Sequence, residues 1–295
     1  TMMNNARLAV GMQGVAVAEA AYQKALAYAQ ERRQGKAADY KGEGMAPIVH
    51  HPDVRRSLVT MKALTQAARA IAYACAHAID LSRAGGEDAA TWGERAGLLT
   101  PLAKAFPTDI GVEVSSIGVQ IHGGMGFIEE TGAAALYRDS RIAPIYEGTN
   151  GIQAIDLVTR KLPLSGGEAV RAYIAELRAD AEALRNSNAE GFGRTAEKVS
   201  AALDDLQAAT DYLLAALGGG RTEEALAGAT PYLRLFSLAA GGAYLIRGAL
   251  AGQDKARVAL ARFFAENLID ETAALKNRVV EGAESLDAAA AALAL

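Results

Sequence analysis

Apolar residues recur every three or four positions along almost the whole chain, and this spacing constrains the fold more than any other feature. Leu8, Met12, Val15, Tyr22 and Leu26 form the first such stripe, which is the pattern of one buried helix face. We find no convincing stretch with the alternation of apolar and polar residues that a half-buried strand shows. The sequence therefore predicts an all-α protein.

Three further helices are expected in the first half of the chain. One begins at Pro52, because proline lacks the amide hydrogen that a first helical turn leaves unpaired anyway. Another runs from about Leu98 to Ile121 and ends at the glycines of "HGGMGF", since glycine readily adopts the left-handed conformation that closes helices. A short helix should follow Glu147 and run to about Lys161.

The segment "LPLSGGE" is the best candidate for a linker, because it combines proline, serine and paired glycines. A chain of 295 residues is longer than the usual single core, so two domains are expected. We assign residues 1–163 to a first helical domain and 164–295 to a second helical bundle. The second carries four more apolar stripes, over residues 170–184, 192–206, 226–244 and 258–279. These most simply predict an up-and-down bundle with a frayed alanine-rich end.

The bulk composition excludes several classes of protein. The net charge of −4 is spread along the chain, whereas nucleic-acid-binding domains show a basic face or stripe. No uninterrupted apolar run reaches the roughly 18–20 residues of a membrane span. The single cysteine, Cys75, cannot form an intrachain disulfide and suits a cytoplasmic protein. It falls on an apolar helical stripe, which favours a place in the core.

A search for common metal-binding and catalytic sequence motifs gives little indication of function. The four histidines, His50, His51, His77 and His122, do not lie at the spacing of zinc ligands, so we expect no metal site. The sequence also contains neither a nucleophile elbow nor a Walker-type phosphate loop. The glycines after His122 close a helix, whereas phosphate loops open one, so capping is the better interpretation of these glycines from the residues alone.

Glu147, in "RIAPIYEGTNGIQ", allows two interpretations. A carboxylate at a helix start is stabilised by the helix dipole by roughly 0.3–1 kcal/mol. Alternatively, Tyr146 forms an apolar wall and Gly148 lets a ligand approach, so that a poorly hydrated Glu147 acts as a base near neutral pH. Composition and periodicity alone favour the helix-end interpretation.

Three motifs taken together point to a known family. In order and spacing, "YAQERRQGKA", "VQIHGGMGFIEE" and "LYRDSRIAPIYEGTNGIQ" resemble the C-terminal helical domain of the flavin-dependent acyl-CoA dehydrogenases. The resemblance covers about Asn4 to Lys161. The remainder is similar to the extra helical domain of the long branch of that family, which includes bacterial fatty acyl-CoA and methylthiopropanoyl-CoA dehydrogenases.

The resemblance implies a catalytic role for Glu147. In that family this glutamate removes the α-proton of an acyl-CoA thioester while the β-hydrogen leaves as hydride to the flavin. The backbone amide of the same glutamate and a flavin hydroxyl polarise the thioester oxygen. Tyr146 and Gly148 are then expected to contact the substrate.

The resemblance also implies contacts with FAD. Arg32 resembles the arginine that pairs with the flavin pyrophosphate of a neighbouring subunit, a role that suits a guanidinium fork. The other implied cofactor contacts come from Gln34, Gln120, Gly123, Gly124 and Thr149. With the resemblance, a ligand-binding role for Gly123 and Gly124 becomes as well supported as helix capping. The chain departs from the family where "RRQGK" lacks a phenylalanine before its glycine and where Gly151 replaces a common glutamine.

The chain resembles only part of such an enzyme. It starts without an initiator methionine and lacks the family's N-terminal helical domain and middle β-domain, so we expect the isolated chain to be inactive and to lose its flavin. The resemblance implies an acyl-CoA substrate, electron-transferring flavoprotein as acceptor, and a homo-oligomer. The alternatives are a non-catalytic helical assembly module and, disfavoured by the acidic charge, a DNA-binding relative.

Overall fold

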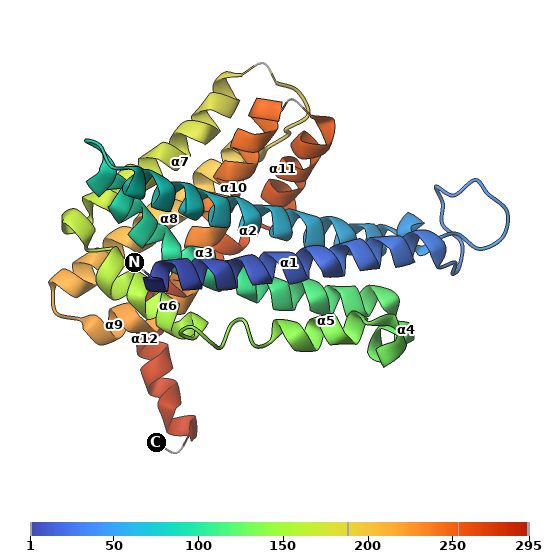
Figure 1. Cartoon of the computed structure of the whole chain (residues 1–295), viewed down its shortest axis with the longest axis horizontal. Helices are drawn as coiled ribbons and strands as arrows, with labels where there is room; N and C mark the ends of the chain where they lie inside the picture. The colour runs from blue at the N-terminus through green and yellow to red at the C-terminus, as the bar shows by residue number, and fades with distance from the viewer. Residues whose placement is uncertain (1, 188, 253, 294–295) are drawn as a thin grey trace.

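The computed structural model describes residues 2–187, 189–252 and 254–293. Within these ranges the chain is built from helices joined by turns, and the one β-type pairing is an isolated bridge between Arg33 and Pro47 (Figure 1). The expectation of an all-α fold is confirmed. The helical segments before the linker are α1 (Met2–Glu31), α2 (Pro52–Ala84), α3 (Ala89–His122), α4 (Gly124–Phe127), α5 (Ala133–Ser140) and α6 (Asn150–Asp156).

The first domain is an up-and-down arrangement of α1, α2, α3 and α5. Arg83 of α2 bonds Asn5 near the start of α1, while Lys62 lies over the Tyr22 ring further along α1, so these two helices are antiparallel. Tyr28, near the end of α1, stacks on His122 at the end of α3. The helices α1 and α3 are therefore parallel neighbours.

Glycines bring α1 and α3 unusually close. A Cβ added to Gly11 would lie 1.8 Å from the carbonyl oxygen of Ala103, and one added to Gly14 would lie 2.3 Å from that of Pro107. Pro107 has no amide hydrogen, so it leaves the Ala103 carbonyl without its helical donor. The bare backbone of Gly11 packs against that carbonyl.

The second domain contains the helices α7 (Glu168–Asn186), α8 (Thr195–Gly218), α9 (Thr222–Ala227), α10 (Ala229–Gly252), α11 (Lys255–Asn267) and α12 (Glu271–Ala289). In the described residues α10 is the one helix long and apolar enough to cross a membrane. Most of that apolar stretch is buried in the protein, where α10 contacts α2, α7, α8, α11 and α12. Such burial is typical of the core helix of a bundle.

The second domain packs on α2 through α10. A Cβ at Gly241 would lie 2.9 Å from the Cβ of Ala67, so this crossing too depends on a missing side chain. Arg95 of α3 lies over the Tyr173 ring of α7 and forms an ion pair of 2.7 Å with Glu176. One continuous cluster of buried residues runs through both parts of the chain, so the expected division into two domains stays a prediction, and the names first and second domain denote residues 1–163 and 164–295.

Three expected helices have different boundaries in the structure. The apolar stripe over residues 226–244 is divided between α9 and α10. The third helix begins at Ala89 and not near Leu98, because its first turns are partly exposed and carry little apolar periodicity. The apolar stripe over residues 258–279 belongs to two helices, α11 and α12, with a corner at Leu268–Asp270. The alanine-rich end continues from α12 into a 3₁₀ turn, Ala290–Leu293, with no buried residues.

Candidate functional site

Glu147 lies in a tight left-handed turn between α5 and α6. Its φ is 56° and that of the next residue, Gly148, is 84°. Glycine adopts such angles freely, but a side chain in this region costs on the order of 1–3 kcal/mol. The turn is closed by a hydrogen bond of 3.0 Å from the amide of Asn150 to the carbonyl of Pro144. The backbone at Glu147 is thus held in a conformation that an ordinary glutamate avoids.

The start of α6 is capped by Thr149. Its hydroxyl oxygen accepts a hydrogen bond of 3.3 Å from the amide of Ile152, which is the usual arrangement of a threonine cap. Glu147 precedes the cap by two residues and makes no such bond among the described residues. The structure therefore answers the capping question in favour of Thr149.

The Glu147 side chain is exposed in this chain, so the apolar shielding expected from the sequence does not come from these residues. Tyr146 is half-buried, and its hydroxyl donates a hydrogen bond to Oε1 of Gln13 on α1. In the described part of the chain, the amide of Glu147 donates to no other group. The residue is thus exposed as a whole, and its amide hydrogen has no acceptor among the described residues.

Gly148 is surrounded more closely than its sequence suggests. A Cβ there would lie 2.9 Å from Nε2 of Gln153, which donates to the carbonyls of Glu147 (3.4 Å) and Gly148 (3.3 Å). Gln153 is fully buried, and its own Oε1 has no partner in the described residues. On that side of Gly148 the space is filled by this amide, so glycine is required there by the backbone angle and by packing.

Several residues that support the turn were not found from the sequence. Lys104 of α3 is fully buried and donates to Oδ1 of Asn150 at 2.8 Å. Arg7 of α1 forms an ion pair of 2.9 Å with the buried carboxylate of Asp156, at the end of α6. The sequence did contain a signal for Lys104, because in "LLTPLAKAFPT" it is the one charged residue in a mainly apolar segment.

The residues expected to contact flavin gather at the opposite end of α1. Arg32 and Gln34 follow the last residue of that helix, and both are exposed. Gln120, Gly123 and Gly124 lie at the end of α3, which the stacking of His122 on Tyr28 places beside the end of α1. A Cβ added to either glycine would meet no atom within 4 Å. This surface offers bare backbone and the exposed side chain of Arg32.

The two groups of residues lie far apart along α1. The Glu147 turn lies near the start of α1, since Tyr146 bonds Gln13 and Asp156 at the end of α6 bonds Arg7. From Gln13 to Arg32 the chain advances by 19 residues, nearly all within α1, which corresponds to roughly 28 Å at 1.5 Å per residue. Figure 1 shows α6 near the start of α1 and α4 toward its other end. Of the expected cofactor contacts, only Thr149 shares the site of Glu147.

The remaining candidates behave as structural residues. Cys75 is fully buried and its Sγ lies 3.8 Å from the hydroxyl of Thr100, so the prediction that it belongs to the core is confirmed. Burial raises the pKa of this thiol to about 11. His51 donates from Nε2 to the carbonyl of Gln34 at 2.7 Å and so fixes that loop. No cluster of three or more potential metal ligands occurs among the described residues.

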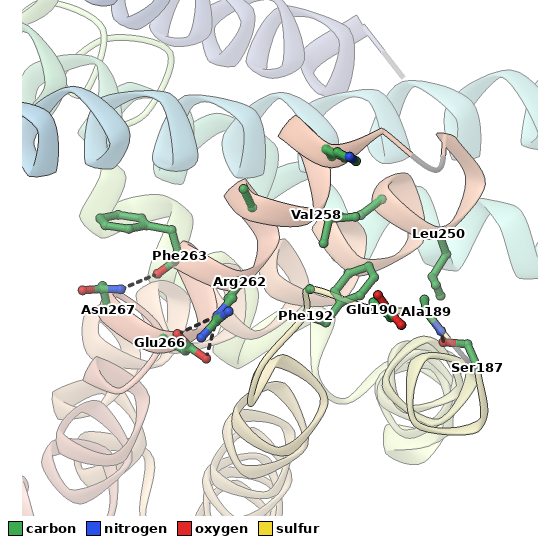
Figure 2. A pocket seen from close by; sticks show the side chains of 14 residues that line it. Ser187, Ala189, Glu190, Phe192, Leu250, Val258, Arg262, Phe263, Glu266 and Asn267 are labelled. Atoms are coloured by element: carbon green, nitrogen blue, oxygen red, sulfur yellow. Dashed lines mark hydrogen bonds and ion pairs between the residues drawn. The ribbon is translucent and has the colours of Figure 1, made fainter.

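A cavity of about 1010 Å³ lies in the second domain, far along the chain from Glu147. Figure 2 shows Phe192, Val258, Phe263 and Leu250 at its apolar part and an ion pair between Arg262 and Glu266 at its edge. These two charges neutralise each other. The cavity contains none of the residues singled out from the sequence, and we assign none of the chemistry to it.

Solved structures share this fold. The chain superposes on Caenorhabditis elegans ACDH-11 in complex with C11-CoA with a TM-score of 0.74 at 20% identity, over 95% of this chain and 47% of that one. It superposes on the acyl-CoA dehydrogenase complexed with FAD from Bacillus anthracis with a TM-score of 0.72 at 22% identity, over 95% and 49% of the two chains.

Sequence relatives give the family. A 3-methylmercaptopropionyl-CoA dehydrogenase of Ruegeria pomeroyi is 43% identical over 97% of this chain and 50% of its own length, so the chain spans about half of that relative. A butyryl-CoA dehydrogenase of Syntrophomonas wolfei is 37% identical over 60% of this chain and 29% of its own. Residues 168–290 match a family described as "Acetyl-CoA dehydrogenase C-terminal like". Residues 1–162 match the family described as "Acyl-CoA dehydrogenase, C-terminal domain", and the chain therefore belongs to the acyl-CoA dehydrogenases.

Proposed function

We propose that this chain is the C-terminal part of an enzyme that dehydrogenates acyl-CoA thioesters between Cα and Cβ, with Glu147 as the base. The observation that carries the proposal is the strained left-handed backbone at Glu147 beside a helix capped by Thr149. Helix capping does not require that strain, and backbone strain of this kind is concentrated at functional sites.

The residues of the turn suit the two tasks of the reaction. The carboxylate of Glu147 takes the α-proton, and the electron pair of that C–H bond forms the new carbon–carbon double bond. The amide hydrogen of Glu147 donates to the thioester oxygen, which stabilises the negative charge that develops there. FAD, when bound, supplies the acceptor for the hydride that leaves the β-carbon. In the full-length protein, further residues shield the exposed carboxylate of Glu147.

The surface at the far end of α1 fits the anionic part of the cofactor. A guanidinium such as that of Arg32 pairs well with phosphate groups. The open backbone at Gly123 and Gly124 allows a close approach, with Gln34 and Gln120 beside it. Because α1 separates this surface from Glu147, we propose that it holds the flavin of a neighbouring copy, while Thr149 contacts the flavin beside Glu147.

The relatives support the choice of substrate and partners. The R. pomeroyi relative is named for a methylmercaptopropionyl thioester of CoA, and the B. anthracis structure contains FAD. A relative from Acetobacterium woodii is named as a subunit of a caffeyl-CoA reductase–Etf complex. We therefore propose an acyl-CoA substrate and electron-transferring flavoprotein as the acceptor.

The decisive experiment replaces Glu147 in the full-length protein. Glu147→Gln should reduce turnover of an acyl-CoA by about 10²–10⁴-fold, the usual contribution of a catalytic base, with FAD still bound. Glu130→Gln, which changes an exposed glutamate outside the turn, is the matched control and should have normal turnover. Near-normal activity of Glu147→Gln would exclude the proposed role.

We also propose that the 295-residue chain does not work alone. Expressed by itself, it should purify without the yellow colour of flavin and should not reduce a dye when acyl-CoA is added. The visible spectrum and the dye assay test this directly. A yellow, active fragment would show that the flavin needs no other part of the protein.

A role in assembly is the second candidate function. Large apolar side chains are exposed along α4, the loop before Glu147 and α6, where Phe127 is 84% and Ile142 is 54% exposed. Exposed apolar groups of this kind mark contact surfaces. Light scattering of the isolated chain should detect an oligomer. Assembly together with full activity of Glu147→Gln would favour this role over catalysis.

A further inference from the structure

Lys104 is the most unusual charged residue of the first domain. It lies in the middle of α3 and is fully buried. Burial lowers the pKa of its amino group from 10.5 to about 8, because desolvation penalises the charged form. Methionine or leucine would fill the same space without that cost. A lysine at this position therefore calls for a specific partner.

That partner is Asn150, the first residue of α6. Nζ of Lys104 donates to the amide oxygen Oδ1 at 2.8 Å. The amide nitrogen of Asn150 donates in turn to Oδ1 of Asp109 (2.7 Å) and to the hydroxyl of Thr108 (2.9 Å). Both ends of the Asn150 side chain are thus fixed to α3, and Lys104, as a donor, and Asp109, as an acceptor, together determine the orientation of the amide.

The main chain of Asn150 closes the turn that carries Glu147. Its amide donates to the carbonyl of Pro144, so the loop from Pro144 to Asn150 depends on the position of Asn150. Thr149, directly before it, caps α6. A shift of Asn150 would release the cap and allow Glu147 to leave its left-handed conformation.

The charges around Lys104 come from three elements. Asp109 of α3 and Glu147 of the turn favour the charged ammonium group, whereas Arg7 of α1 opposes it. Lys104 thus interacts electrostatically with the carboxylate of Glu147 and, through Asn150, also holds the backbone of the same turn.

We propose that Lys104 is a positioning residue for Glu147: its hydrogen bond to Asn150 holds the 144–150 turn in the geometry in which the carboxylate and the amide of Glu147 face the same ligand. The proposal rests on the proposed function of Glu147 as the base. Lys104 does not touch the substrate. It acts through Asn150.

The test uses the full-length protein with FAD and the variant Lys104→Met. Removal of a charge-assisted hydrogen bond should speed amide hydrogen exchange of residues 147–153 about tenfold or more, whereas exchange in the second domain stays unchanged. The melting temperature should stay equal or rise, because an apolar side chain replaces a buried charge. The turnover number should fall about 10²-fold through misplacement of the base, with FAD content and KM nearly unchanged.

Three further variants keep the result unambiguous. Asn150→Ala should reproduce the local exchange and the loss of turnover, and the double variant should be no worse than either single one, since both remove one interaction. Asn150→Ala also tests the proposal if Lys104→Met does not fold. Lys198→Met, which removes a lysine paired with Asp270 at 2.7 Å in the second domain, is the matched control and should leave turnover and exchange at 147–153 unchanged.

The outcomes separate the two proposals. Unchanged exchange at 147–153 in both Lys104→Met and Asn150→Ala would overturn the positioning role, and so would faster exchange with normal turnover. Normal turnover of Glu147→Gln would instead overturn the proposed function of the base. In that case the exchange data alone decide whether Lys104 holds the turn.

Discussion

The guanidinium of Arg7, near the start of α1, forms an ion pair of 2.9 Å with the carboxylate of Asp156, the last residue of α6. The Asp156 side chain is 2% exposed and also accepts from Arg160 at 2.5 Å. Lys104 fixes the first residue of α6 and Arg7 fixes the last, so the short helix after Glu147 is held at both ends. The turn at Glu147 is therefore supported by α1 and α3 together.

Asp156→Ala should destabilise the chain strongly. The substitution leaves the Arg7 guanidinium, with a side chain only 15% exposed, without its carboxylate partner, and breaking such a buried pair costs about 3–5 kcal/mol. Urea unfolding gives the change in free energy. The control is Glu129→Ala, because Glu129 pairs with Arg138 on the exposed surface and surface pairs contribute little. Equal effects of the two substitutions would contradict this prediction.

The stability of the chain should rise with pH in a window set by Lys104. Below about pH 8 the lysine is charged in both the folded and the unfolded state, and the folded state carries the cost of burying the charge. Between about pH 8 and 10.5 the folded state has released the proton while the unfolded state still binds it, so stability increases with pH.

The magnitude follows from the difference in pKa between the two states. Wild type should gain up to about 3 kcal/mol relative to Lys104→Met across this window. Chemical denaturation of both proteins between about pH 7.5 and about pH 10 tests the prediction. The contributions of all other titrating groups cancel in the comparison of the two proteins. A difference that does not change with pH would show that Lys104 keeps its usual pKa in the folded state.

Gly14→Ala should weaken the contact between α1 and α3. The new methyl group would lie 2.3 Å from the Pro107 carbonyl oxygen and 2.5 Å from its carbon, both in the backbone. Overpacking of this kind costs about 1–3 kcal/mol. Gly248→Ala in α10 is the counterpart: a Cβ there meets no atom within 4 Å, so the helix should gain up to about 1 kcal/mol. Thermal unfolding should move the two variants in opposite directions.

Glu147→Gly should separate stability from activity. Glycine accepts a φ of 56° without steric cost, so the free energy of unfolding should rise by up to about 1 kcal/mol. The same change removes the carboxylate and should abolish turnover in the full-length protein. Glu147→Gln keeps the strain and should leave stability unchanged. A glycine variant less stable than wild type would mean that Glu147 makes favourable contacts that outweigh the strain.

Much of the fold follows from the 3.6-residue period, but corners and buried helix surfaces do not. The helical periodicity continues without a break through the corner between α11 and α12, as the buried or half-buried positions Ala265, Leu268 and Leu275 show. Ile269, at the corner itself, also points inward and is 1% exposed. Periodicity cannot detect such a corner. Asp270 before Glu271 is a start signal for a helix, and it could have divided the stripe.

The site was only partly predictable for a different reason. The motif around Glu147 identifies the turn, but its exposure and its backbone angle depend on long-range contacts. Lys104 lies 46 positions from Asn150, and Arg7 lies 149 positions from Asp156. Pairings over such distances leave no local pattern. The predicted contacts of Arg32, Gln120 and Thr149 with flavin stay predictions.

A cell with two damaged copies of the gene, one altered at Arg32 and the other at Glu147, should regain part of its activity. This outcome follows from our proposal that Arg32 holds the flavin of a neighbouring copy: each mixed pair of subunits would combine the intact carboxylate of one chain with the intact guanidinium of the other. A chain altered at both positions would do the opposite. Paired with a normal chain, it would spoil both sites and act as a dominant inhibitor.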